Sequence, residues 1–132
     1  MTQQEVVTYW LDKAKDELKS ADIMFNAGQN LYMGFMCHQA IEKALKAYYV
    51  FLKDERQPHE HNLFKLLTYV ELFDATDDLK KNTIEKLNPL YVKTRYEDYK
   101  NTISSLLTNS YCKALLAETK ELLAWITELM NL

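Results

Sequence analysis

The segment from about Leu31 to Lys53 constrains the fold most, because it is apolar around most of its helical circumference. Its polar side chains form one narrow stripe at helical spacing: His38, Gln39, Glu42, Lys43 and Lys46. A helix with so wide an apolar surface must be covered on several sides. We therefore expect this segment to be the middle of the domain, or to contact a second subunit as well.

Two further long helices are predicted at the ends of the chain. Thr2 and Glu5 have the spacing of a capping box, so the first helix begins there. Ala27-Gly28 predicts its end, because glycine accepts the left-handed conformation that closes many helices. The last helix has apolar residues at steps of three, four and seven, which place them on one face: Tyr111, Leu115, Leu122, Trp125, Leu129 and Leu132.

Two shorter helices are expected between the long ones. One follows His61, and the next is capped by Thr76 or Asp77 and contains Pro89, which should bend or split it. The chain has only two glycines and two prolines, fewer than a turn-rich β fold normally needs. The sequence therefore predicts a single all-α domain over 1–132, a five-helix up-and-down bundle with three long and two shorter helices.

Composition excludes several classes of function. The formal net charge of −3 argues against a broad basic face for duplex DNA. No apolar stretch approaches the roughly 20 residues of a membrane span, and the N-terminus lacks a signal region. Cys37 and Cys112 form no metal-binding pair, so free thiols in a reducing compartment are expected. We expect a cytoplasmic protein with no membrane contact, cofactor or metal.

Three motifs resemble the HEPN family of helical proteins. They are Cys37-His38-Gln39-Ala40-Ile41-Glu42-Lys43-Ala44-Leu45-Lys46-Ala47, then Leu87-Asn88-Pro89-Leu90-Tyr91, and then Arg95-Tyr96-Glu97-Asp98. The resemblance covers essentially the whole chain and implies an up-and-down helical bundle that commonly dimerises. Many members are metal-independent ribonucleases, toxins paired with a small nucleotidyltransferase antitoxin. Others have been linked to RNA or nucleotide binding without cleavage.

This chain departs from the motif of the ribonuclease members, an Arg and a His four to six residues apart near the last helix. Arg95 matches the Arg, but no His follows it, and all three histidines, His38, His59 and His61, lie in the first half. RNA cleavage without metal usually needs a proton acceptor and a cation for the phosphate. If the chain cleaves RNA, Arg95 is the expected cation and His61 the expected base.

The residues of the motifs also define a candidate ligand site. Arg95 would contact phosphate and Tyr96 would stack on a base. The other candidates are Tyr91, Asp98, His38, Lys43 and Lys46. The competing interpretation is structural: Arg95 pairs with a nearby carboxylate, the polar stripe is a solvated face with a Glu42–Lys46 ion pair, and His61 caps the next helix while His59 is exposed. For the stripe and the histidines, the residues alone favour the structural interpretation.

Three functional hypotheses follow from the sequence. The first is a homodimer that binds RNA or a nucleotide, or serves as one half of a pair with a nucleotidyltransferase antitoxin. The second is a divergent metal-independent ribonuclease that uses Arg95 and His61. The third is a dimeric interaction module with no ligand.

Overall fold

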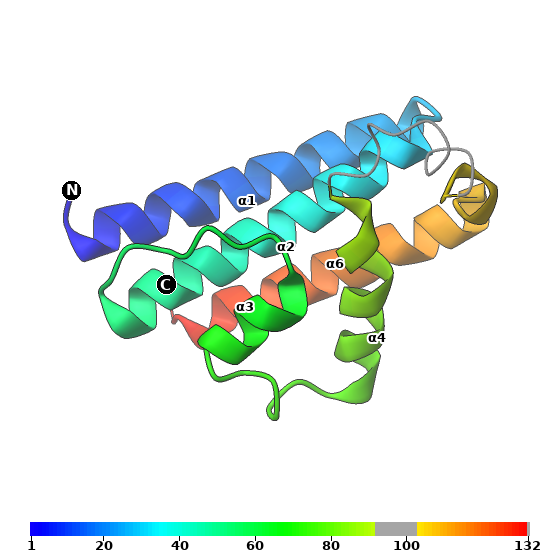
Figure 1. Cartoon of the computed structure of the whole chain (residues 1–132). Helices are drawn as coiled ribbons and strands as arrows, with labels where there is room; N and C mark the ends of the chain where they lie inside the picture. The colour runs from blue at the N-terminus through cyan, green and yellow to red at the C-terminus, as the bar shows by residue number, and fades with distance from the viewer. Residues whose placement is uncertain (92–102, 132) are drawn as a thin grey trace.

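The structure, a computed structural model, describes residues 1–91 and 103–131 (Figure 1). Its elements are α1 (Gln3–Asn26), α2 (Asn30–Lys53), α3 (Leu63–Tyr69), α4 (Asp78–Leu87), the 3-10 helix η1 (Asn88–Leu90) and α6 (Asn109–Leu129). A short helical turn at 103–106 precedes α6, and the described residues contain no strand. The predicted all-α bundle, with three long helices and two shorter ones, is confirmed, and η1 and the turn at 103–106 are additions to it.

Helix α2 lies at the centre of the molecule. Helix α1 runs antiparallel along one side of it and α6 lies along another, while α3 and α4 sit beside this long layer (Figure 1). Met33, Ile41 and Leu45 of α2 are completely buried among these neighbours. Most of the apolar surface of α2 is therefore covered within one chain, as expected for the middle of the domain, while Tyr32, Phe51 and Leu52 near its two ends remain exposed.

The helix ends follow from their local chemistry. The hydroxyl of Thr2 accepts a hydrogen bond from the backbone N–H of Glu5 at 3.1 Å and caps α1. Gly28, just after α1, has φ +74°, the left-handed conformation that glycine adopts without strain. The side chain of Asp77 accepts from the backbone N–H of Lys80 at 2.9 Å and caps α4. These three predicted boundaries are confirmed.

Pro89 splits its helix, as predicted, and the break brings the chain close to α2. Helix α4 ends at Leu87, and η1 continues with Pro89 in its first turn. Buried Leu90 then packs on α2 at Gly34, where an added Cβ would lie only 2.9 Å from Leu90 Cδ1. Because Gly34 has no side chain, η1 can approach α2 closely, and this approach places Tyr91 next to α2.

None of the helices described in 1–91 and 103–131 is long and apolar enough to cross a membrane. The two longest, α1 and α2, both carry charged side chains within their length.

Candidate functional site

Three of the five residues in the polar stripe of α2 are buried, and Gln39 and Lys43 are partly buried. The exposed fraction is 0% for His38, 3% for Glu42 and 6% for Lys46. His61, from the connection between α2 and α3, contacts both His38 and Glu42. The interpretation as a solvated face is therefore wrong for His38, Glu42 and Lys46, because the residues after α2 fold back over them. The pattern of a helix alone cannot show that a later irregular segment will cover its polar side.

The carboxylate of Glu42 is the centre of these contacts. Its Oε1 lies 2.9 Å from Nδ1 of His61, and its Oε2 accepts a hydrogen bond from Nζ of Lys46 at 3.0 Å. Nδ1 of His38 lies farther away, at 3.8 Å from Oε1. A buried carboxylate is costly unless it is paired and hydrogen-bonded. Here each oxygen of Glu42 has a partner, one on its own helix and one on the connection.

His38 holds the backbone of His61 in place. Its Nε2 lies 2.9 Å from the carbonyl oxygen of His61, and because a carbonyl only accepts, this nitrogen carries the proton. Burial lowers the pKa of His38 to about 4, so its ring is neutral at pH 7. Its unprotonated Nδ1 then accepts from the side-chain amide of Gln39 at 3.5 Å.

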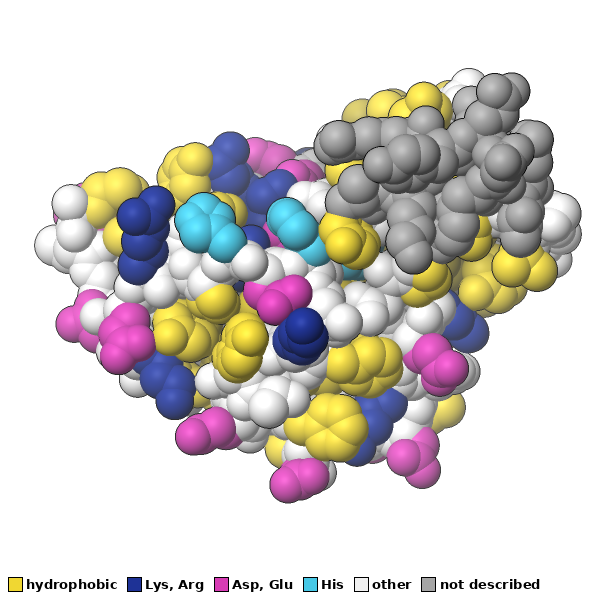
Figure 2. Space-filling view, in the orientation of Figure 1, with side chains coloured by type: hydrophobic (Ala, Val, Ile, Leu, Met, Phe, Trp, Pro, Cys, Tyr) yellow, Lys and Arg dark blue, Asp and Glu magenta, His cyan; other side chains and the backbone are white. Residues whose placement is uncertain are grey.

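Tyr91 completes the arrangement by stacking on both imidazoles. Its ring centroid lies 5.1 Å from that of His38 and 5.1 Å from that of His61, with interplanar angles of 23° and 21°. The side chain of His61 remains 53% exposed. Histidine side chains are accordingly visible on one face of the molecule (Figure 2). We call these residues the His61 cluster: His38, Glu42, Lys46, His61 and Tyr91.

A hollow of about 380 Å³ adjoins this cluster. It is lined by Asn62, Phe64, Glu85, Asn88, Pro89 and Tyr91. Tyr91 belongs both to the hollow and to the cluster. The aromatic rings of Phe64 and Tyr91 provide flat apolar surface, and the amides of Asn62 and Asn88 provide polar groups. Such a combination suits a planar heterocycle with hydrogen-bonding edges.

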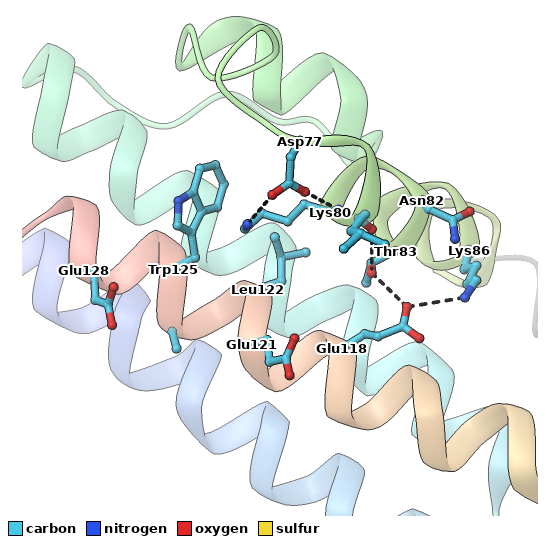
Figure 3. A pocket seen from close by; sticks show the side chains of 12 residues that line it. Asp77, Lys80, Asn82, Thr83, Lys86, Glu118, Glu121, Leu122, Trp125 and Glu128 are labelled. Carbon is cyan, nitrogen blue, oxygen red and sulfur yellow. Dashed lines mark hydrogen bonds and ion pairs between the residues drawn. The ribbon is translucent and has the colours of Figure 1, made fainter.

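A larger groove, of about 530 Å³, lies between α4 and α6 (Figure 3). Four carboxylates and two lysines line it: Asp77, Glu118, Glu121, Glu128, Lys80 and Lys86. Both lysines are paired, Lys80 with Asp77 at 2.8 Å and Lys86 with Glu118 at 3.3 Å. The surplus of negative charge disfavours a phosphate-bearing ligand in this groove. The hollow beside the His61 cluster has a single charged lining residue, Glu85, so it carries less negative charge and is the better candidate.

The structure separates one predicted ligand residue from the others. Lys43 pairs with Glu17 of α1, whose pKa is raised by partial burial. It therefore faces another side of α2, whereas His38, Lys46, His61 and Tyr91 come together in one cluster. The remaining candidates, Arg95, Tyr96 and Asp98, lie outside the described residues.

Two roles differ from those predicted. Asn62, not His61, caps α3: its Oδ1 accepts from the backbone N–H groups of Phe64 at 3.0 Å and Lys65 at 3.2 Å. Glu42 was expected to form only an ion pair with Lys46, yet it also binds His61. The available signal was the spacing of Glu42 four residues after His38 and four before Lys46, which places all three on one face. His59 is exposed, as expected.

Metal and thiol chemistry find no support in the part of the chain that the structure describes. Among residues 1–91 and 103–131, no group of three or more His, Cys, Asp or Glu side chains could hold a metal ion. Cys37 and Cys112 are buried free thiols. Burial raises their pKa values to about 12 and about 11, so neither provides a thiolate at neutral pH.

Comparison with known proteins agrees with this architecture. A family model described as the HEPN domain matches residues 7–129, so the chain belongs to the HEPN domain family. The fold is similar to the crystal structure of TT1696 from Thermus thermophilus, with a TM-score of 0.71 and 22% sequence identity. That match covers 92% of this chain and 96% of the other. No curated protein matches the sequence.

Proposed function

We propose that this HEPN-domain protein binds RNA or a nucleotide at the His61 cluster and the adjoining hollow. The observation that carries the proposal is the position of Tyr91, which lines the hollow and stacks on the half-exposed His61. A base in the hollow would lie against Phe64 and Tyr91. Stacking of this kind accepts any base, because every base has an aromatic face.

Phosphate recognition is assigned to the segment that follows Tyr91 in the sequence. Arg95 comes four residues later, and Lys93 and Lys100 flank it. A guanidinium matches the geometry of a phosphate group and stays charged at every physiological pH. In this proposal Tyr96 and Tyr99 add stacking surface, and Asp98 belongs to the same ligand-contacting set. Lys46 acts indirectly, because its ammonium group is committed to Glu42.

The test is a titration of the protein with a fluorescent oligoribonucleotide and with mononucleotides at two salt concentrations. Arg95→Ala and Tyr91→Ala should each weaken binding at least five-fold. Lys113→Ala is the matched control for charge, because Lys113 is exposed on α6, away from the hollow. Equal affinity of the wild type, Arg95→Ala and Tyr91→Ala would refute the proposal.

The contact between Glu42 and His61 favours a second function, metal-independent ribonuclease activity. A carboxylate behind an exposed imidazole is a common way to prepare a proton acceptor. His61 would then replace the histidine that is missing after Arg95. Incubating the protein with unstructured RNA in EDTA tests this function, and intact RNA after prolonged incubation would count against it.

We also propose that the protein associates with other chains, and membership of the HEPN family supports this proposal. A homodimer and a nucleotidyltransferase partner are the two associations proposed. Multi-angle light scattering gives the mass in solution, and co-purification with a candidate nucleotidyltransferase tests the second. If the protein is a stable dimer and neither nucleotides nor RNA change its melting temperature, the result would instead support a dimeric interaction module with no ligand.

A further inference from the structure

We propose that Glu42 is a positioning residue, which fixes the proton of the His61 imidazole on Nδ1 and leaves Nε2 as the proton-accepting atom. This inference rests on the second candidate function, ribonuclease activity. Nothing in the motif of the HEPN ribonucleases gives Glu42 this role. It follows from four contacts in the His61 cluster.

The first contact fixes the tautomer of His61. Oε1 of Glu42 lies 2.9 Å from Nδ1, and a carboxylate accepts hydrogen bonds, so Nδ1 is the nitrogen that donates. In the neutral ring the lone pair is then on Nε2. Among the described residues Nε2 has no hydrogen-bond partner, and the side chain is 53% exposed. Nε2 is thus available to a hydroxyl group from outside.

The other three contacts fix the orientation of the ring. His38, which is fully buried, holds the carbonyl oxygen of His61 at 2.9 Å. Tyr91 stacks on the imidazole at an interplanar angle of 21°. Lys46 binds the other oxygen of Glu42 and so keeps the carboxylate itself from turning. His38 thus holds the backbone of His61, Tyr91 holds the face of its ring, and Glu42 holds one ring nitrogen. A preorganised acid–base group requires such restraint.

The reaction that suits this arrangement is transesterification of RNA. Nε2 takes the proton of a ribose 2′-hydroxyl while the 2′-oxygen forms a bond to the adjacent phosphorus. The bond from phosphorus to the 5′-oxygen breaks, and that oxygen takes a proton from the imidazolium or from water. The products are a 2′,3′-cyclic phosphate and a 5′-hydroxyl. No metal, oxidant or co-reactant enters the balance. Glu42 touches neither substrate nor reacting atoms and acts only through His61.

The decisive experiment compares cleavage and binding in the same set of variants. Unstructured RNA is incubated in EDTA, between pH 5 and pH 9, with the wild type and with each of four variants: His61→Ala, Glu42→Gln, Glu42→Asp and His59→Ala. We expect Glu42→Gln to lower kcat by about 10²–10⁴-fold with KM and RNA affinity unchanged, because buried Glu42 touches no ligand. His61→Ala should lower kcat at least as much and also weaken RNA binding, because His61 belongs to the proposed binding site. Glu42→Asp should recover part of the rate. His59→Ala, two residues from His61 but without contact to Glu42, should behave as the wild type.

A second measurement, which is informative on the wild type even if a variant does not fold, reports the tautomer directly. Nitrogen-15 NMR of the imidazoles should show the proton of neutral His61 on Nδ1, and a shift toward Nε2 in Glu42→Gln. A wild-type proton on Nε2 would overturn the proposal, as would cleavage by Glu42→Gln at the wild-type rate. RNA that is bound but never cut would also overturn it, while leaving the binding proposal intact. Absence of binding would contradict both.

Discussion

The side-chain amide of Asn88 donates a hydrogen bond to Oδ1 of Asn62 at 3.3 Å, across 26 residues of sequence. Oδ1 of Asn88 in turn accepts from the backbone N–H of Leu63 at 2.9 Å. Asn62 follows His61 directly, and Asn88 precedes Tyr91 by three residues. This pair therefore ties together the two segments that carry the half-exposed members of the cluster, and both asparagines line the adjoining hollow.

Asn88→Ala should destabilise the protein and loosen the start of α3. The substitution leaves the buried N–H of Leu63 without its acceptor, which costs about 1–3 kcal/mol in unfolding free energy. Asn82→Ala is the matched control, because Asn82 is exposed on α4, the helix that leads into Asn88. This substitution should change the unfolding free energy by less than about 0.5 kcal/mol. Urea denaturation monitored by circular dichroism measures both. Equal midpoints for the two variants would contradict the assigned role of Asn88.

Gly34→Val should push η1 away from α2. Leu90 Cδ1 already lies 2.9 Å from the place of a Cβ at position 34, and Leu90 is buried, so it has little room to move. Overpacking of this kind costs about 1–3 kcal/mol. A double-mutant cycle with Leu90→Ala measures the contact directly. The double variant should be more stable than the sum of the single effects predicts, and strict additivity would show that positions 34 and 90 do not meet.

Acid should destabilise the protein through His38. Its pKa is about 4 when folded and 6.5 when unfolded, so below pH 6.5 the unfolded chain binds a proton that the folded chain does not. This contribution to stability is complete above pH 6.5 and is lost as the pH falls toward 4. Between pH 7 and pH 5 the loss is about 2 kcal/mol.

His38→Gln should therefore show a smaller loss of stability over that pH range, by about 2 kcal/mol in unfolding free energy. Its absolute stability at pH 7 should be lower, because the hydrogen bond to the carbonyl of His61 is disturbed. His59→Gln should keep the pH dependence of the wild type, because His59 is exposed. Parallel stability curves for the wild type and His38→Gln would show that His38 is not buried in the neutral form.

Lys43→Met should leave ligand binding unchanged and lower stability modestly. Lys43 pairs with Glu17, and both side chains are about one-fifth exposed, so the expected loss is about 1 kcal/mol or less. Its affinity for the fluorescent oligoribonucleotide should stay within two-fold of the wild type. A loss of affinity comparable to that of Arg95→Ala would instead show that Lys43 contributes to ligand binding.

Much of the fold could be predicted because its signals are local. The Thr2 cap, the Gly28 terminator and the Pro89 break each depend on the chemistry of one or two residues. The central place of α2 follows from its wide apolar surface, which has to be covered. These features need no knowledge of which distant residues come into contact.

The site was less predictable because it depends on contacts between segments. His38, Glu42 and Lys46 form a stripe that also suits a solvated face, and only the path of the connection before α3 shows that it is covered. Asn62 and His61 are neighbours with similar capping ability, and the pairing of Asn62 with Asn88 decides between them. The contact of Glu42 with His61 was not predicted, because the ion pair with Lys46 already gave the carboxylate a partner.

The position of His61 on a connection has a consequence for how the molecule folds. Helices α1 and α2 are joined only by residues 27–29 and make a local hairpin, whereas the contact of His61 with Glu42 spans 19 residues and joins an irregular segment to a finished helix. Helical hairpins rich in local contacts form early in folding, whereas a contact such as that of His61 with Glu42 forms late. Substitutions at His61 should therefore speed unfolding and leave the refolding rate unchanged. The side chain at position 61 can consequently change during evolution without altering the route by which the chain reaches its native state.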